Sequence, residues 1–311
     1  MSHLILSIFT CLIRAAAGDS NTMVLFPTAW QDYALLDSGN GQKLERFGTY
    51  TLIRPDSNAL WQPTLPRREW DAADAVFQLS TPNNGIWHFR RKLPSRWQIG
   101  YRNLRFWVQP TPFRHVGVFP EQATHWDWLI ARIAEAESPP RLLSLFSYTG
   151  LATLAAAAAG ASVAHVDASK KAVAWARENA ALSNLADRPI RWLVDDALKF
   201  AAREVRRGAR YEGFILDPPP FGHGASGELW TFDKSMPQLM ALIRQLLSEK
   251  LCCVVITAYT AKTTLPALRR LLAETMADHK GSLEAGELGL RQQSAARTLP
   301  TALYVRWRTT S

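Results

Sequence analysis

The sequence predicts an α/β protein in which a mostly parallel sheet, with helices on both faces, follows a smaller β-rich N-terminal domain. From residue 141 onward, short apolar runs alternate with helix-forming stretches, and between residues 30 and 112 short β-rich runs are separated by turn-forming residues. The length of 311 residues fits two domains. A hydrophobic fraction of 47% with 20% charged residues is typical of globular proteins and disfavours disordered, collagen-like and membrane-bundle classes.

Residues 1–24 are expected to be an unstructured or mis-assigned start. Their apolar run, residues 4–13, has about half of the ~20 residues that a membrane-spanning helix needs. Arg14 follows this run, whereas a signal peptide carries basic residues before its apolar core, so export is the minor alternative. Cys11, Cys252 and Cys253 show neither disulfide nor zinc spacing. We therefore predict a cytoplasmic protein that holds no metal and contacts no membrane.

Residues 25–115 are predicted to form the β-rich domain. Two candidate strands flank the turn sequence Ser-Gly-Asn-Gly at residues 38–41, and prolines punctuate the runs that follow. Pro120 suits the first position of a helix that ends before Pro139. Residues 116–140 are therefore expected to form a helix that connects this domain to the second one, residues 141–311.

The second domain is predicted from strictly alternating strands and helices. Gly160 closes the first helix, an alanine tract, and Ser169 suits the N-cap of the second. Such alternation implies right-handed crossovers and a parallel sheet, and the last two apolar runs predict an antiparallel hairpin at the sheet edge. The expected strands are 141–146, 161–167, 190–194, 211–217, 251–259, 282–293 and 298–308, and the expected helices are 149–160, 169–184, 196–208, 236–250 and one after residue 265.

Polar residues follow four of the predicted parallel strands. Ligands bind at the carboxyl ends of the strands in open sheets of this type, so these residues should line one edge. The four strand ends are residues 146–150, Asp167, Asp195 with Asp196, and residues 217–221.

The composition of this edge favours adenosine over a dinucleotide. The first turn has a single glycine, Gly150, and lacks the G-x-G-x-x-G spacing that a pyrophosphate needs. An acid after the second strand suits two ribose hydroxyls, and one after the third can accept from an adenine amino group, which together fit S-adenosylmethionine. The alternative for Asp167, Asp195 and Asp196 is that each merely caps a helix.

The most specific motif is Asp-Pro-Pro-Pro-Phe, which begins at Asp217. Pro218 and Pro219 remove two backbone donors and leave carbonyls that only accept hydrogen bonds. Together with the Asp217 carboxylate they can hold an exocyclic amine while the base stacks on Phe221, which orients the nitrogen toward an electrophilic methyl group. The alternative is a proline-rich turn that simply ends a strand.

With these motifs the chain resembles the class I S-adenosylmethionine-dependent methyltransferases, and within them the large-subunit ribosomal-RNA methyltransferase group. The resemblance covers residues 115–307 and implies a Rossmann-like class I methyltransferase sheet with S-adenosyl-L-methionine as cofactor. It implies that the first turn wraps the methionine part, that the acids bind ribose and adenine, and that the proline motif faces the acceptor. It assigns Phe146, Ser147, Tyr148, Thr149, Gly150, Asp167, Ala168, Asp195, Asp196, Ala197 and Gln122 to the cofactor, and Asp217, Pro218 and Phe221 to catalysis.

Three features depart from the pattern of that group. Leu151 stands where a second glycine is usual, and Pro220 stands where a lysine is common. Members that methylate C5 of cytosine need a cysteine just after the fifth strand, but residues 256–259 read Ile-Thr-Ala-Tyr. Cys252 and Cys253 lie in an apolar run and are expected to be inert, so methylation of a nitrogen is favoured.

The charge of the chain indicates an anionic partner. A net charge of +9 favours nucleic acid. Residues 88–107 carry six basic and five aromatic residues without an acid, which is typical of single-stranded RNA recognition, although a solvated strand face over core aromatics has the same composition. Residues 223–227 are expected to be a mobile loop over the acceptor. Packing or surface roles are expected for the histidines His115, His125, His165 and His223.

The predicted function is transfer of a methyl group from S-adenosylmethionine to a base of ribosomal RNA, with a nitrogen as the favoured acceptor atom. The alternatives are methylation of a small molecule or a protein, a non-catalytic RNA-binding protein that keeps the cofactor fold, and a nicotinamide enzyme. RNA is the expected partner. The sequence leaves the oligomeric state open, with a homodimer among the alternatives.

Overall fold

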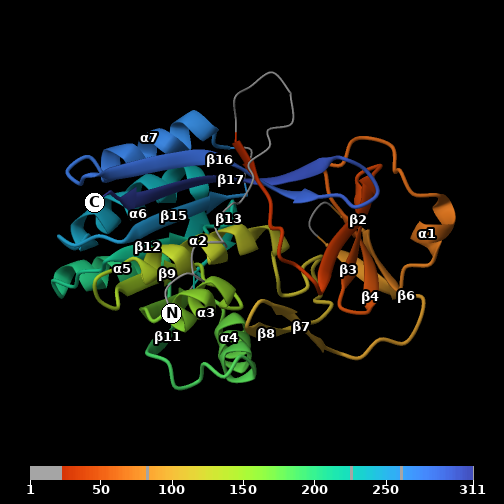
Figure 1. The fold of residues 1–311 in the computed structure, drawn as a ribbon, viewed down its shortest axis with the longest axis horizontal. Helices are drawn as coiled ribbons and strands as arrows, with labels where there is room; N and C mark the ends of the chain where they lie inside the picture. The colour runs from red at the N-terminus through yellow and green to blue at the C-terminus, as the bar shows by residue number, and fades with distance from the viewer. Residues whose placement is uncertain (1–22, 82–83, 225–226, 260–261, 311) are drawn as a thin grey trace, which may run out of the picture.

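The computed structural model describes residues 23–81, 84–224, 227–259 and 262–310, and an eight-stranded sheet is its largest unit (Figure 1). In spatial order the strands are β1 (Met23–Leu25), β16 (Gly281–Arg291), β17 (Thr298–Thr309), β15 (Cys253–Ala258), β12 (Gly213–Leu216), β9 (Arg141–Leu145), β10 (Ser162–Asp167) and β11 (Ile190–Val194). The five strands from β15 to β11 run parallel to one another, whereas β17 is antiparallel to both β15 and β16.

Helices cover both faces of this sheet (Figure 1). One face packs against α2 (Ala123–Ala134) and α3 (Leu151–Ala158), and the other against α5 (Ala197–Arg206), α6 (Phe232–Leu246) and α7 (Leu265–Thr275). Leu142 and Leu143, adjacent on β9, are both fully buried because side chains alternate along a strand and each enters a different core. Burial on both faces explains why the parallel strands are almost continuously apolar. None of the helices in the described ranges has the length and apolar character to cross a membrane.

The N-terminal half forms a separate five-stranded sheet and a two-stranded hairpin. The turn between the first two strands has Asn40 at φ 52° and Gly41 at φ 74°, and this left-handed pair matches the twist of a two-residue hairpin. The five strands are β2 (Tyr33–Gly39), β3 (Gln42–Phe47), β4 (Tyr50–Pro55), β5 (Ala75–Leu79) and β6 (Gly85–Phe89), with α1 (Arg67–Asp71) between β4 and β5, and the hairpin is β7 (Trp97–Tyr101) and β8 (Leu104–Val108).

Asp37 joins this half to the large sheet. It lies on β2, is fully buried, and accepts hydrogen bonds from the Trp70 indole at 3.0 Å and from the backbone at residues 64 and 65. It also accepts from Gln292 at 2.6 Å and Ser294 at 2.8 Å, which lie in the connection between β16 and β17. One carboxylate therefore holds the N-terminal sheet against the C-terminal hairpin.

The strands and helices expected over residues 141–275 are confirmed, as is the β-rich N-terminal sheet. Ser169 caps α4 (Lys170–Leu182) by accepting from the backbone nitrogen of Ala172 at 3.2 Å. The expectation for Pro120 is confirmed in part, because it opens the 3₁₀ turn η1 (Pro120–Gln122), which leads directly into α2. The domain boundaries at residues 115 and 140 remain a proposal.

Three expectations need correction. Residues 23 and 24, expected in the irregular start, belong to β1, which pairs with β16, so the C-terminal hairpin does not form the sheet edge. The α6 helix begins at Phe232, four residues before the expected start. It continues through Pro237, and buried residues of the helix lie on both sides of this proline. The residues around the expected loop 223–227 form a hairpin, β13 (Phe221–His223) with β14 (Leu229–Thr231). Residues 1–22 and 225–226 lie outside the described residues.

We expect Asp37→Ala to lower the free energy of unfolding by about 3 kcal/mol or more, because it leaves several buried donors without an acceptor. Denaturant unfolding measures the loss. Asp71→Ala is the matched control, since Asp71 is about half exposed in an ion pair with Arg67 and should cost less than about 1 kcal/mol. Equal effects of the two substitutions would contradict the role of Asp37.

Candidate functional site

The turn after β9, residues 146–150, has a constrained backbone. Phe146, Tyr148 and Gly150 have φ values of 59°, 46° and 85°, in the left-handed region that non-glycine residues rarely adopt. A Cβ atom on Gly150 would lie 2.8 Å from the Cβ of Ala176 on α4. Glycine is therefore required at this position for the turn to pack against α4.

Asp167, the last residue of β10, lies directly against this turn. Its Oδ2 accepts a hydrogen bond from the backbone nitrogen of Tyr148 at 2.7 Å, and its Oδ1 accepts from that of Ser169 at 2.8 Å. Ala168 lies between Asp167 and this N-cap. Burial raises the pKa of Asp167 in spite of these two donors. Each carboxylate oxygen keeps a second lone pair that can accept a hydrogen bond. Two such acceptors side by side suit two neighbouring ribose hydroxyls.

The two acids after β11 bond within the chain. The Asp195 backbone nitrogen donates to the Asp167 carbonyl at 3.0 Å, so the two strand ends are adjacent. Asp196 caps α5, whose first residue is Ala197, by accepting from the backbone nitrogen of Lys199 at 2.9 Å. Asp195 forms an ion pair with Arg203. The alternative interpretation from the sequence, that Asp196 caps a helix, therefore agrees with the contact it makes.

Asp217, the residue after β12, is an acid whose ionisation is strongly perturbed. Its Oδ1 is buried and, among the described residues, makes no hydrogen bond. Burial, with Glu121 and Asp167 nearby, raises its pKa to about 8, although a hydrogen bond with Gln122 opposes the shift. Glu121, Asp167 and Asp217 form a carboxyl cluster, and burial raises the pKa of each member. Such a cluster favours a cationic ligand because opposite charge stabilises ionised carboxylates.

A small cavity of about 50 Å³ lies between Asp217 and the turn after β9. Gln122 and all five residues of the turn line it, whereas Asp167, Asp195 and Asp196 do not. The cavity therefore collects the residues predicted for the methionine end of the cofactor, and the residues predicted for the adenosine end lie along the adjoining strand ends.

His125, on α2, also lines this small cavity and was expected only to pack. Its Nδ1 accepts from the Arg306 guanidinium, with 2.9 Å to Nε, which places the ring proton on Nε2. Burial and Arg306 hold the pKa of His125 well below its usual range, so the ring is neutral. Its Nε2 is buried and makes no hydrogen bond to the described residues. No signal in the sequence distinguishes this histidine from the others.

The proline motif divides between buried and exposed positions. Pro218 is buried, and the Pro219 carbonyl accepts from the Trp230 indole at 2.8 Å. Phe221 is 57% exposed on β13, packs edge-on against His223 at 5.3 Å, and lines neither of the two cavities described here. The motif therefore brings Asp217 to the small cavity, while Phe221 projects from the hairpin that follows.

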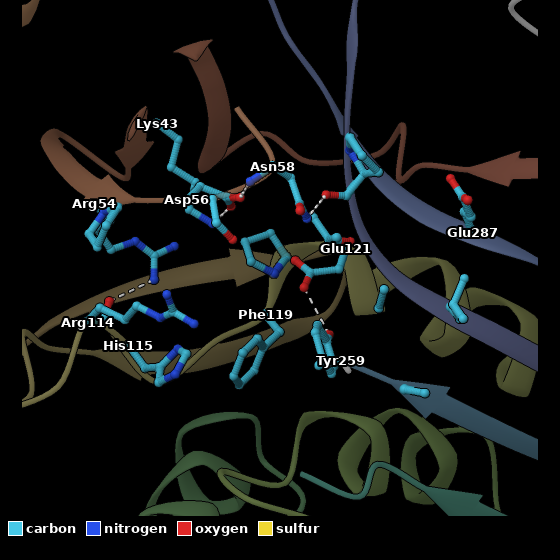
Figure 2. A pocket seen from close by; sticks show the side chains of 18 of the residues that line it. Lys43, Arg54, Asp56, Asn58, Arg114, His115, Phe119, Glu121, Tyr259 and Glu287 are labelled. Atoms are coloured by element: carbon cyan, nitrogen blue, oxygen red, sulfur yellow. Dashed lines mark hydrogen bonds and ion pairs between the residues drawn. The ribbon is translucent and has the colours of Figure 1, made fainter. Parts of the chain in front are cut away.

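A larger cavity of about 520 Å³ lies where the N-terminal sheet meets the large sheet (Figure 2). Its walls include Arg54 at the end of β4, His115 and Phe119 of the connecting segment, Tyr259 after β15, and Thr301 on β17. It shares Phe119 with the small cavity, so the two cavities adjoin.

A chain of hydrogen bonds connects the two cavities. The Tyr259 hydroxyl donates to Glu121 Oε1 at 2.9 Å, and Gln122 Nε2 donates to the same hydroxyl at 3.1 Å. Gln122 also lowers the pKa of Asp217, with which it lines the small cavity. The sequence analysis did not identify Glu121 or Tyr259, because only the fold brings the 3₁₀ turn η1 against the end of β15.

The basic and aromatic residues of segment 88–107 mostly serve the fold. The rings of Trp97, Tyr101 and Phe106 are buried in the core. Arg96 pairs with Glu178, and further arginines pair with acids outside the segment. The three buried rings agree with the structural alternative, whereas the six basic side chains are exposed, so RNA binding by this segment stays a prediction.

Comparisons with known proteins identify relatives along the whole chain. No protein-family model matches it. A crystal structure of a SAM-dependent methyltransferase from Agrobacterium tumefaciens is 41% identical, covers 96% of this chain and 98% of its own, and has a TM-score of 0.89. A methyltransferase structure complexed with SAH covers 90% of this chain and 76% of its own, at 16% identity and a TM-score of 0.70, and this likeness shows the fold.

Curated relatives match less than half of the chain. The "Ribosomal RNA large subunit methyltransferase K/L" of Chromohalobacter salexigens is 33% identical over 129 residues, which is 41% of this chain and 17% of that protein. The protein of the same name from Pseudomonas paraeruginosa is 31% identical over 146 residues, 47% of this chain and 19% of that protein. The matched stretch thus spans less than a fifth of the length of these relatives.

We expect Asp217→Asn to stabilise the protein at pH 7. The pKa of Asp217 is about 8 in the folded chain against an ordinary value of 3.8, so between these values unfolding releases a proton and rising pH favours the unfolded state. Asparagine removes this penalty, and the melting temperature should rise by a few degrees at pH 7 and converge with that of the unmodified protein near pH 4. Asp278→Asn, at an exposed ion pair, is the control. A pH-independent difference would contradict the raised pKa.

Proposed function

The chain belongs to the S-adenosylmethionine-dependent methyltransferases, and we propose that it transfers the methyl group to a nitrogen of a base in ribosomal RNA. The observation that carries the proposal is the buried Asp217 carboxyl with an unused oxygen, at the end of β12 and beside the turn after β9. The names of the curated relatives support RNA as the acceptor.

The described residues suit the cofactor in charge and shape. The turn of residues 146–150 would enclose the methionine part, with Gln122 opposite, and Asp167 would accept from the ribose hydroxyls. Asp195 and Asp196 would face the adenine, next to Ala168 and Ala197. When bound, the cofactor supplies a methyl group made electrophilic by a positive sulfonium. The ionised acids of the carboxyl cluster would stabilise that positive charge more strongly than water does.

Asp217 and the Pro218 carbonyl would position the acceptor. Both accept hydrogen bonds from an exocyclic amine, which turns the nitrogen lone pair toward the methyl carbon. The amine loses a proton when it is methylated, and Asp217, in the ionised form that a nearby positive charge favours, would accept that proton. Phe221, exposed on its hairpin, would stack on the base or on its neighbour.

The positions of the cysteines support nitrogen over C5 as the acceptor atom. Cys252 and Cys253 are buried at the start of β15, which is the end opposite the carboxyl edge. The carboxyl end of that strand carries Thr257 and Tyr259 instead. A covalent adduct at C6 of cytosine needs a thiolate beside the base, and no thiol of the described residues lies there.

We expect the purified protein to transfer labelled methyl from the cofactor to total RNA from a strain that lacks the gene. Nucleoside mass analysis of that RNA should identify a base methylated on nitrogen. Asp217→Ala should reduce transfer by about 100-fold or more, because it removes the base and the orienting acceptor. Asp278→Ala, an exposed acid elsewhere, should leave the rate unchanged. Undiminished transfer by Asp217→Ala would remove Asp217 from the reaction.

We expect Asp167→Ala to weaken cofactor binding about 10- to 100-fold, since a charged acceptor of two hydroxyls is lost. Isothermal titration calorimetry with S-adenosylhomocysteine measures the change. Glu178→Ala, an exposed acid on α4, is the control. An unchanged dissociation constant for Asp167→Ala would contradict the ribose assignment.

A further inference from the structure

The larger cavity has the dimensions of a binding site and contains chemical groups that the cofactor does not use. Its volume of about 520 Å³ lies in the range of small-molecule sites, roughly 300–1,000 Å³. Parts of the chain that are distant in sequence build it, including the end of β4, the connecting segment before α2, the end of β15, and the hairpin of β16 and β17 (Figure 2).

One wall of the larger cavity is aromatic. The ring of Phe119 lies 5.0 Å from that of His115 and 5.4 Å from that of Tyr259, with interplanar angles of 45° and 47°. Phe119 also lies 5.8 Å from Tyr148 in the turn after β9. The wall therefore leads from the larger cavity to the cofactor turn, and it suits a flat heterocycle.

A buried acid lies beside this wall. Glu121 is 4% exposed, and its side chain points into the cavity together with the Tyr259 hydroxyl that bonds to it (Figure 2). A carboxylate beside a hydroxyl can accept from amino or imino hydrogens on the edge of a base. Through Tyr259 the same hydrogen bonds continue to Gln122, which lines the small cavity together with Asp217, so a base on Glu121 would lie close to the proposed cofactor site.

Cationic side chains lie on the opposite side of the cavity. Arg54 is held by Glu45 at 2.7 and 2.8 Å, and it donates to the Arg114 carbonyl at 3.0 Å. Lys43 pairs with Asp56 at 3.2 Å. Arg114 is exposed, and its guanidinium extends into the cavity beside Arg54 (Figure 2). Its position suits a phosphate at the mouth of the cavity.

The geometry points to this cavity as the acceptor pocket, which takes one unstacked base of the RNA with its face on Phe119, its ring edge on Glu121 and its phosphate on Arg114, while the amino nitrogen extends toward Asp217 in the adjoining small cavity. The inference rests on the proposed function, because it names where that reaction's acceptor binds. The inference places the RNA base where the two sheets meet, so segment 88–107 is not required to bind it. Extruding a single base costs a few kcal/mol, and the aromatic wall and buried polar groups offset this cost.

Three variants of the full-length protein test the pocket, each assayed for RNA methylation and for calorimetric binding of S-adenosylhomocysteine. Glu121→Gln should lower kcat/KM for RNA about tenfold or more, because its amide presents donors to the ring edge of the base. Arg114→Ala should raise KM several-fold with little change in kcat. Thr301→Trp, on the far wall, should fill the cavity and abolish methylation. All three should keep the cofactor dissociation constant within about threefold, which also reports folding.

The controls are Arg188→Ala, an exposed arginine after α4, and Thr309→Trp, at the exposed end of β17, and both should behave as the unmodified protein. Normal RNA methylation by Glu121→Gln and Thr301→Trp would overturn the pocket while leaving the proposed function intact. An unmodified protein that binds cofactor but methylates no RNA would overturn the proposed function itself. Methylation of a small molecule, lost in Thr301→Trp, would overturn the RNA base as occupant.

Discussion

The parallel pairing of β9 with β10 and β12 is the constraint on which the rest of the structure depends. Val166 of β10 and Leu216 of β12 both lie in register with Leu145. The turn after β9, Asp167 and Asp217 therefore emerge at one edge, although 50 residues of chain separate the two acids. A shift of one residue in either pairing would turn one of these carboxyls to the other face of the sheet.

Several acids lie together at this edge of the sheet, and their mutual repulsion costs free energy. This cost indicates that the edge binds a positively charged ligand. Loss of solvation is the main cause of the raised pKa of Asp217, and the charges of Glu121 and Asp167 add to it, a cost that a stable protein carries only where the rest of the fold offsets it. A positively charged sulfonium relieves the repulsion on binding.

The N-terminal sheet contributes walls to the larger cavity and none to the small one. Asp37 ties it to the C-terminal hairpin, and Arg54 with Glu45 gives the larger cavity a rigid side. Because the connecting segment passes between the two sheets, Phe119 faces both cavities and Glu121 and Gln122 extend the contact toward Asp217. The two halves of the chain thus enclose a site that neither contains alone.

The sequence by itself determined the order of strands and helices, the caps at Ser169 and Asp196, and the strand ends that carry Asp167 and Asp217, because these follow from local periodicity, turn chemistry and the rule that parallel strands share an edge. Only the tertiary structure decided the roles of β1, Glu121, His125 and Tyr259. Their neighbours lie up to 263 residues away, as with Met23 and Gly286 in β1 and β16, and such long-range packing leaves no local pattern. The same holds for the rings of Trp97, Tyr101 and Phe106 in segment 88–107, whose burial in the core the composition alone did not determine.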